Sequence, residues 1–263
     1  MTKQVSAIEL TEYCNKILNS NSYKDGCVNG LQVDATFTKP IKKIAYSVDA
    51  GLSVIKAAIK INADILLTHH ALIWGQGERA ITDISAQKLG LLFNNKCSLF
   101  SYHLPLDGDL TYGNGIGIAN WFKTKKIDIS KISGFGMCDG SFVGLRGELK
   151  KAVSLNEIYK ILKTFPDSSY QYFFPFGKQT IKTIGIVTGA GDFAIQEAAI
   201  NGIDLFLSGE PKQSVYHNAK EAEQSCAFVG HYASETFGVE LLAKHIGKKF
   251  GIDIVKINEP TGI

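Results

Sequence analysis

The sequence lacks a strong charge of one sign, paired cysteines and any long apolar run. Its 28 Lys and Arg against 25 Asp and Glu give a formal charge of +3, too small to indicate a nucleic-acid or membrane-surface partner. The five cysteines lie far apart and never form a CxxC pair, which excludes a disulfide framework and a thiolate zinc site. No apolar run approaches the ~20 residues that span a membrane, and the N-terminus does not resemble an export signal. We therefore expect a cytoplasmic protein without a membrane partner.

The chain does have enough apolar residues for substantial cores, since 45% of its 263 residues are hydrophobic. Short apolar runs recur, and each ends in a polar or glycine-rich turn. The runs are residues 44–48, 65–67, 98–102, 184–187, 205–207 and 227–229. Several of the segments between them have apolar residues at helical spacing. This alternation of strand and helix predicts an α/β fold with mostly parallel sheets.

Part of the sequence occurs twice. Residues 42–70 align without gaps on residues 182–210. The identical pairs are Lys42/Lys182, Ile44/Ile184, Ala50/Ala190, Gly51/Gly191, Ile55/Ile195, Ala58/Ala198, Asp64/Asp204 and Leu67/Leu207. Further along, an apolar strand is twice followed by histidine and, four residues later, a carboxylate. Similar βαβ units can share residues by chance, but the ordered recurrence of both blocks favours an internal duplication that produced two similar α/β domains.

The domain boundaries follow from polar stretches and from the last apolar run. The Lys-rich segment 123–133 has the composition of a linker, and residues 252–257 predict a final strand. We expect a first domain of residues 1–125, to which residues 230–263 return, and a second domain of residues 126–229.

Histidines and carboxylates gather where apolar runs end. They are His69 and His70, His103 with Asp107, and His231 with Glu235. Loops at the carboxyl ends of parallel strands form functional crevices, and nitrogen and oxygen ligands suit Zn, Mn, Fe, Co or Ni. Adjacent histidines in extended backbone point to opposite sides, which favours two neighbouring ions over one. Each pattern alone also fits a buried hydrogen-bonded pair or a solvated helix, so the residues by themselves leave both interpretations open.

A set of motifs in fixed order resembles a known family. The motifs are Cys27-Val-Asn29-Gly30-Leu31-Gln32, Ser47-Val-Asp49, Thr68-His69-His70-Ala-Leu-Ile-Trp74, Tyr102-His103-Leu-Pro-Leu-Asp107, Ser208-Gly209-Glu210 and Gly230-His231-Tyr-Ala-Ser-Glu235. Together they resemble the NGG-one interacting factor three-like family, whose members are also named GTP cyclohydrolase 1 type 2 homologues. The resemblance runs from about residue 5 to the C-terminus. It implies a dinuclear metal site between two similar α/β domains, and a toroidal homohexamer with the sites facing its cavity.

The same resemblance implies the ligands. Carried over residue by residue, two divalent metal ions per subunit (Zn, Fe, Mn, Co or Ni) are held by His69, His70, Asp107, His231 and Glu235. His103 matches a family histidine near the metals that we treat as non-ligating. Tyr232 stands where the family often has a second histidine, which affects the pocket and not the ligands.

Two functions are compatible with this site. The first is a metal-dependent hydrolase acting on a small molecule, such as a nucleotide like GTP, a phosphoester or a cyclic amide. In it, His103 is the general acid and base, and the substrate-binding residues are Asn29, Gln32, Trp74 and His217. The second is a non-catalytic, ring-shaped regulatory or interaction scaffold with structural or stored metals. Five side chains for two ions leave coordination positions open, which favours catalysis.

Nucleotide and nucleic-acid signatures are weak. The sequence has no phosphate loop of the GxxxxGK[ST] type, and we interpret Thr188-Gly189-Ala190-Gly191-Asp192 as an ordinary turn between a strand and a helix. Nucleic-acid binding through a central hole would require a basic cavity face, which the net charge does not support.

Overall fold

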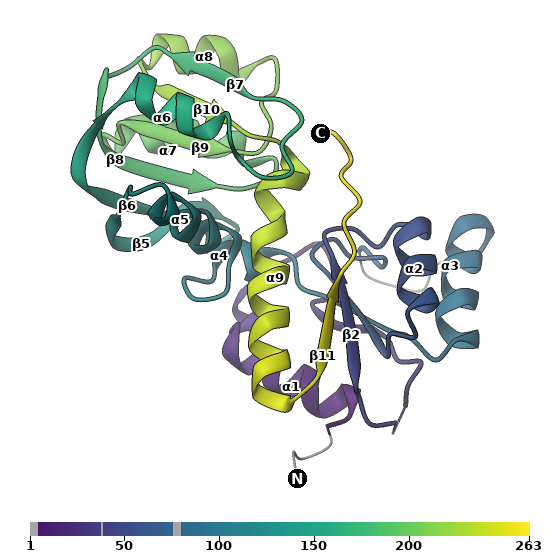
Figure 1. Ribbon diagram of the computed structural model, residues 1–263. Helices are drawn as coiled ribbons and strands as arrows, with labels where there is room; N and C mark the ends of the chain where they lie inside the picture. The colour runs from purple at the N-terminus through teal and green to yellow at the C-terminus, as the bar shows by residue number, and fades with distance from the viewer. Residues whose placement is uncertain (1–4, 38, 76–79) are drawn as a thin grey trace. The chain divides into compact units, whose positions relative to one another are not determined.

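The computed structural model describes residues 5–37, 39–75 and 80–263, which form two compact units (Figure 1). The first unit runs to Leu106 and includes Val239–Glu259, and the second comprises Asp107–Gly238 and Pro260–Ile263. The second unit thus extends further on both sides than the predicted 126–229. Ile118 and Phe122 on one side and Ala233 on the other pack into its core. Among the described helices, none is long and apolar enough to cross a membrane.

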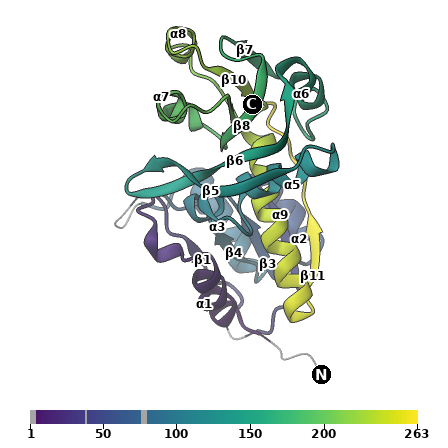
Figure 2. The ribbon, with the colours of Figure 1, turned by 90° about the vertical axis from the view of Figure 1, so that its left-hand side faces the viewer.

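The first unit is a five-stranded sheet between helices. Its elements are α1 (Ala7–Ile17), η1 (Ser20–Ser22), β1 (Gly30–Val33), β2 (Lys43–Ser47), α2 (Leu52–Lys60), β3 (Ile65–Thr68), α3 (Asp83–Asn94), β4 (Ser98–Ser101) and β11 (Asp253–Lys256). Two helices, α4 (Leu104–Gly108) and α9 (His231–Phe250), contain two of the three points where the chain changes units, and the third follows Glu259. Figures 1 and 2 show α2 and α3 on one face of the sheet, with α1 and the last part of α9 on the other.

The strands of this sheet lie in the order β1-β4-β3-β2-β11. Neighbouring strands from β4 to β11 pair in parallel, and β1 pairs with β4 in the antiparallel direction. The C-terminal run predicted as a strand is therefore β11, at the edge of the first sheet beside β2. Strands β2 and β3 are apolar on both faces because helices cover both, as expected for a parallel sheet.

The second unit is built on a six-stranded mixed sheet. Its elements are α5 (Asn114–Thr124), β5 (Ile129–Cys138), β6 (Ser141–Ser154), α6 (Leu155–Leu162), β7 (Tyr172–Pro175), β8 (Thr180–Val187), η2 (Gly191–Ala194), α7 (Ile195–Ile200), β9 (Leu205–Ser208), α8 (Val215–Glu221) and β10 (Ser225–Phe228). The strand order is β5-β6-β8-β9-β10-β7, and Figure 2 shows α7 and α8 on one side of this sheet and α6 on the other.

The prediction of mostly parallel strands is wrong for this second sheet. Among its described pairings, β8–β9 and β9–β10 are parallel, whereas β5–β6, β6–β8 and β10–β7 are antiparallel. The antiparallel part begins with the long β5–β6 hairpin, whose turn contains Asp139 and Gly140 with φ of 46° and 89°. Positive φ at both positions is the geometry of a tight hairpin turn, and an Asp-Gly pair is its usual sequence.

The two units share the order of a core set of elements. Helix α1 and strands β1 to β4 in the first unit correspond to α6 and β7 to β10 in the second, with α2 and α3 matched by α7 and α8. Within the sheets, β1-β4-β3-β2 corresponds to β7-β10-β9-β8, and both sets have an antiparallel strand at one edge. An origin by duplication remains our prediction.

A buried aspartate, Asp64, directly before β3, connects that strand to the segment that leads into β2. Asp64 Oδ1 accepts a hydrogen bond from Lys39 Nζ at 2.6 Å, and Oδ2 accepts from the backbone N–H groups of Lys42 and Lys43 at 2.8 and 3.0 Å. Burial raises the pKa of Asp64, but these bonds and the charge of Lys39 outweigh it and lower the pKa below its usual value. The carboxylate therefore stabilises the entry into both β2 and β3.

The second unit repeats this arrangement at Asp204. Its Oδ1 accepts from Lys178 Nζ at 2.6 Å, and its Oδ2 accepts from the backbone N–H groups of Lys182 and Thr183 at 2.8 and 2.9 Å. Its pKa is lowered as well, by the same kinds of contact acting against burial. The identity of Asp64 and Asp204 in the aligned sequence thus corresponds to an identical role in the structure.

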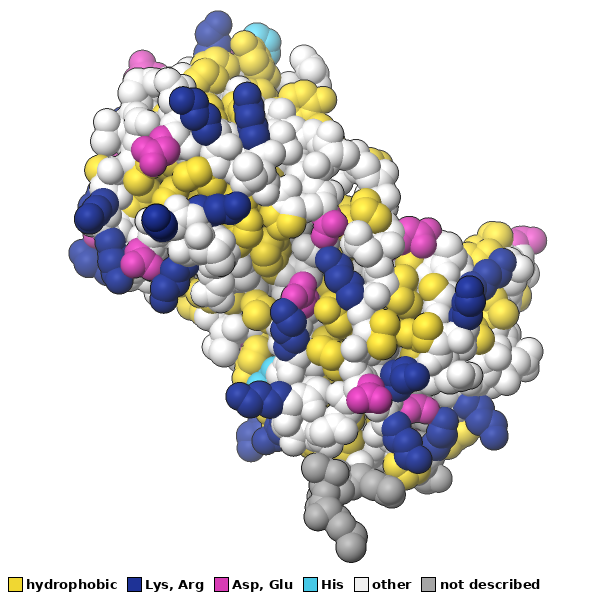
Figure 3. All heavy atoms as spheres, viewed as in Figure 1, with side chains coloured by type: hydrophobic (Ala, Val, Ile, Leu, Met, Phe, Trp, Pro, Cys, Tyr) yellow, Lys and Arg dark blue, Asp and Glu magenta, His cyan; other side chains and the backbone are white. Residues whose placement is uncertain are grey.

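The surface carries side chains of both charge signs. On the face shown in Figure 3, Lys and Arg side chains are spread out, with Asp and Glu side chains among them. This mixture agrees with the small formal charge of +3.

Candidate metal centre

Three histidines meet at one edge of the first sheet. His69 and His70 follow β3, and His103 follows the neighbouring parallel strand β4. One ring nitrogen of each lies within 4.8 Å of those of the other two. The first unit alone therefore gathers three imidazoles at the carboxyl ends of two adjacent strands, where a parallel sheet places its functional loops.

The two histidines predicted as ligands in this unit are oriented by oxygen acceptors. His69 Nδ1 lies 3.0 Å from the carbonyl oxygen of Tyr102, and His70 Nδ1 lies 2.7 Å from Asp49 Oδ1. Because a carbonyl and a carboxylate only accept hydrogen bonds, Nδ1 carries the proton and Nε2 presents a lone pair. Proteins commonly orient metal-binding histidines in this way.

His103 is held in the same manner by Asp25. The two atoms His103 Nδ1 and Asp25 Oδ1 are 2.9 Å apart, and Asp25 also accepts from Asn29 Nδ2 and from the backbone N–H of Leu104. Burial raises the pKa of Asp25, but the hydrogen bonds from His103, Asn29 and Leu104 and the charge of His103 together hold it well below the usual range. Asp25 is thus a buried carboxylate that fixes the proton on Nδ1 of His103, a role that no sequence motif indicated.

Two of the three predicted substrate-binding residues of this unit, Asn29 and Gln32, form hydrogen bonds within the unit itself. Asn29 accepts from the backbone N–H of His103 at 2.8 Å while its amide donates to the carboxylate already described. Gln32 Oε1 accepts from the backbone N–H groups of residues 72–73 at 2.9 and 3.0 Å. Trp74, 37% exposed, lies edge-on to His103 with 5.0 Å between ring centroids. Of the three, Trp74 offers an open surface beside the histidines.

The second unit brings together the other three predicted ligands. Asp107 lies in α4, and His231 and Glu235 lie in the first turns of α9. Carboxylate oxygens of Asp107 and Glu235 approach within 4.8 Å, and His231 Nε2 is 3.1 Å from Glu235 Oε2. Both acids are buried, with 9% and 3% of their surface exposed. Two buried carboxylates so close together favour a bound cation, because burying like charges without one is costly.

Neighbouring residues orient these groups too. Asp107 Oδ1 accepts from Asn114 Nδ2 and from Thr188 Oγ1, each at 2.9 Å. His231 Nδ1 lies 3.2 Å from Glu210 Oε1, the same imidazole–carboxylate contact seen in the first unit. Glu210 belongs to one of the family motifs, although we did not predict a role for it.

The glycine turn after β8 forms a wall of this acidic group. Gly189 has φ of +58°, and a Cβ atom there would lie 2.1 Å from Glu235 Oε1 and 3.0 Å from His231 Nε2. Its backbone N–H donates to Ser234 Oγ at 3.0 Å. The turn that we interpreted as an ordinary connection therefore needs glycine at this position for conformation and for space.

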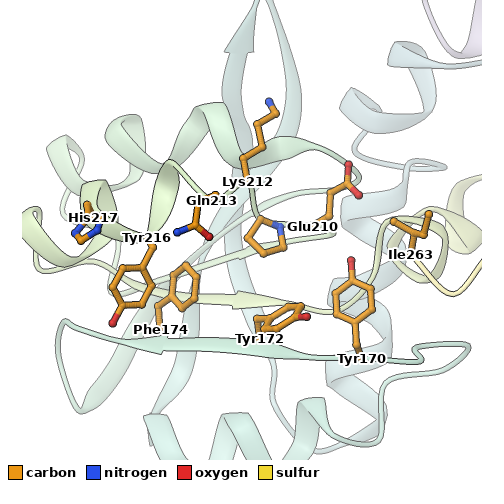
Figure 4. Close-up of a pocket in the computed structure, with 10 residues that line it drawn as sticks. Tyr170, Tyr172, Phe174, Glu210, Lys212, Gln213, Tyr216, His217 and Ile263 are labelled. Atoms are coloured by element: carbon orange, nitrogen blue, oxygen red, sulfur yellow. The ribbon is translucent and has the colours of Figure 1, made fainter.

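His217 lies apart from these ligands. It is in α8 and lines a cavity of about 680 Å³, one end of which includes Glu210. Figure 4 shows His217 beyond Tyr216, at the opposite end of the cavity from Glu210.

The family model for Duf34/NIF3 (NGG1p interacting factor 3) matches residues 5–261. The chain belongs to the Duf34/NIF3 family. The predicted resemblance is therefore confirmed. Among relatives, the GTP cyclohydrolase 1 type 2 homolog of Archaeoglobus fulgidus is 36% identical over 255 residues, covering 97% of this chain and 98% of that protein. The homolog of Deinococcus radiodurans is 33% identical over 261 residues, covering 99% and 95%.

Solved structures of similar proteins agree with the fold of this Duf34/NIF3 member. TTHA1606 from Thermus thermophilus has a TM-score of 0.85 and 28% identity, covering 98% of this chain and all (100%) of that one. Protein ybgI, described as of unknown function, has a TM-score of 0.86 and 25% identity, with coverage of 98% and 100%.

The donor set of the Duf34/NIF3 chain fits divalent transition metals. The first unit offers imidazole nitrogens, and the second offers two carboxylates and an imidazole. Such mixed nitrogen and oxygen ligands are of borderline hardness, which suits Zn, Fe, Mn, Co and Ni.

Proposed function

We propose that this Duf34/NIF3 protein binds two divalent metal ions through His69, His70, Asp107, His231 and Glu235, and that it hydrolyses a small molecule. One observation carries the proposal: Nδ1 of each proposed ligand histidine, His69, His70 and His231, lies next to an oxygen acceptor of the same unit. That arrangement makes Nε2 the ligand atom of His69 and His70. Nε2 of His231 lies 3.1 Å from Glu235 Oε2, a contact that a cation bound by both side chains would replace. The buried pair of Asp107 and Glu235 supplies the negative charge that balances a cation.

Bound metal ions of this kind acidify a water molecule and polarise a substrate oxygen. The chain itself supplies a group for proton transfer, because Asp25 keeps the proton of His103 on Nδ1. Nε2 of His103 can then accept a proton and return it. Trp74 packs edge-on against the same ring.

The substrate class that we propose is a nucleotide such as GTP, a phosphoester or a cyclic amide. Its support is the name GTP cyclohydrolase 1 type 2 homolog, which the relatives carry. The test compares wild type, His103→Ala and His69→Ala for metal content and for turnover of these three classes. We expect His103→Ala to keep its metals and lose turnover at least a hundredfold, and His69→Ala to lose metal. Wild-type protein that is fully loaded but turns over none of the substrates would contradict the hydrolase and favour a scaffold with structural or stored metals.

We also propose a homohexamer, on the strength of the family resemblance, and a cytoplasmic location. All five cysteines lie among the described residues and are free thiols, in keeping with a reducing compartment. The molar mass of the purified protein by light scattering tests the hexamer.

A further inference from the structure

The second unit contains a cavity of about 680 Å³ whose walls are largely aromatic (Figure 4). One wall is the edge strand β7 with the residues before it, and the other is the segment from Glu210 to α8. The lining side chains that matter here are Tyr170, Tyr172, Phe174, Tyr216, Glu210 and Lys212. No predicted ligand of the metal centre lies in this lining, although Glu210 contacts His231.

The aromatic side chains form a row because of strand geometry. Tyr172 and Phe174 alternate within β7, so their side chains share one face of the edge strand. Tyr170 precedes the strand, and its ring lies 5.1 Å from that of Tyr172. Tyr216 packs edge-on against Phe174, with 5.2 Å between ring centroids. Tyr172 and Tyr216 nevertheless remain 52% and 38% exposed. Rings exposed inside a concave site offer faces on which another ring can stack.

Polar groups mark the ends of the row. Glu210 lies near Tyr170 at one end, and burial together with the charge of Glu210 raises the pKa of Tyr170. The same carboxylate contacts His231 through Oε1, but a carboxylate can accept several hydrogen bonds. Lys212 is the cation of this lining, and it pairs with Asp192 at 3.1 Å. Glu210 thus offers the cavity an acceptor for N–H groups, whereas the ammonium group of Lys212 is already paired with Asp192.

We infer that this cavity binds a planar heteroaromatic ring with N–H donors along one edge. The ring stacks on Tyr172, beside the end of the row that holds Tyr170 and Glu210 (Figure 4), and its N–H groups donate to Glu210. Lys212 is paired with Asp192, so the inference for this cavity concerns the ring and not a phosphate group. Because Glu210 also holds His231, the ring belongs to the molecule on which the metal centre acts, and this assignment rests on the proposed function.

The test measures ring binding in metal-free, full-length protein by calorimetry, with guanosine and adenosine as probes. Guanosine presents two adjacent N–H donors to a carboxylate, and adenosine does not, so wild type should prefer guanosine. Tyr172→Ala should weaken guanosine binding at least tenfold, as expected for a lost stacking contact. Glu210→Gln should remove the preference for guanosine over adenosine. Phe193→Ala is the control, since Phe193 is 49% exposed in the same unit and does not line the cavity.

Unchanged guanosine binding in Tyr172→Ala and Glu210→Gln would overturn the inference. It would also be overturned if a single-stranded oligonucleotide or a polysaccharide bound this row more tightly than the nucleoside, or if Tyr172→Ala changed only the oligomeric state. Since metal-free protein is used, ring binding without turnover in the loaded protein would contradict the hydrolase and leave the ring site standing.

Discussion

The two βαβ segments, residues 43–68 and 183–208, have a similar backbone arrangement and different side chains at the site. In the first, the two backbone N–H groups of residues 69–70 donate to the carbonyl of Val48 at 3.0 and 2.8 Å. In the second, those of residues 209–210 donate to the carbonyl of Gly189 at 3.1 and 3.0 Å. In both segments one carbonyl accepts from the two N–H groups that follow the second strand, but the acceptor stands one position later in the second segment, because Val48 aligns with Thr188 and not with Gly189. The donating residues are two histidines in one segment and glycine with glutamate in the other.

One aligned pair of positions makes this difference clear. Asp49 in the first segment accepts a hydrogen bond from His70, whereas its counterpart Gly189 leaves room for Glu235 and His231. A side chain at the turn orients a ligand in one unit, and the lack of a side chain admits ligands in the other. A shared framework can therefore serve two different ligand sets when only a few turn positions change.

The largest effect is expected from Gly189→Ala. The added Cβ would meet Glu235 Oε1 at 2.1 Å, so the carboxylate and His231 must move, and the second unit should lose its metal. Metal content by plasma mass spectrometry measures the loss. Gly202→Ala is the matched control, because Gly202 has a similar φ of +65° but no heavy atom within 4 Å of the point that its Cβ would occupy. If Gly189→Ala bound metal as well as Gly202→Ala does, the added Cβ would be accommodated and the requirement for space at this turn would be contradicted.

A smaller effect is expected from Asp49→Asn. The amide can still accept from His70 Nδ1, but it lacks the charge that makes the imidazole a better ligand, so metal affinity should fall about 10–100-fold. A competition titration with a chelating dye measures the affinity. Asp253→Asn, on the exposed edge strand β11, should leave it unchanged. An unchanged metal affinity in Asp49→Asn would show that the charge of this carboxylate does not contribute to metal binding through His70.

The comparison also predicts equal costs for the two buried aspartates. Asp64→Asn and Asp204→Asn each weaken one charge-assisted contact to lysine and two to backbone N–H groups, so each should lower the free energy of unfolding by about 2 kcal/mol. Urea unfolding measures both. Asp128→Asn breaks an exposed ion pair with Lys150 and should cost less than about 0.5 kcal/mol. A large difference between Asp64→Asn and Asp204→Asn would mean that the two segments are not energetically alike.

The smallest expected effect is a change with pH in the stability difference between wild type and the variant that carries both Asp64→Asn and Asp204→Asn. The folded-state pKa values of Asp64 and Asp204 are lowered, so their stabilisation is complete above the unfolded-state value of about 4 and is lost as the pH falls below it. The gap in unfolding free energy between wild type and the double Asn variant should therefore narrow from pH 7 to pH 3. Urea unfolding at both pH values checks this. A gap independent of pH would argue against ionised carboxylates at these positions.

Much of the site could be predicted because its signals are local. The histidines stand directly after apolar runs, and parallel strands bring such positions to one edge of a sheet. The alignment of Asp64 with Asp204 likewise reflected a shared contact pattern. These features need no knowledge of distant residues.

The remaining parts depend on tertiary contacts or on a turn that we did not recognise. Asp25 precedes His103 by 78 positions, and nothing in either local sequence indicates the contact. The space that Gly189 leaves for Glu235 exists only after folding. The second sheet is mixed because Asp139 and Gly140 form a hairpin, a local signal that the expectation of βαβ units led us to overlook.

Strand β11 has a consequence for synthesis on the ribosome. β2 pairs with β11, but β11 is translated only after nearly all of the second unit. Until then, the nascent first unit has an open strand edge on β2, four of whose five residues are buried in the finished protein. Open apolar edges invite association with other chains. A chaperone that holds the growing chain until its C-terminus is released would therefore protect this protein at its most exposed stage.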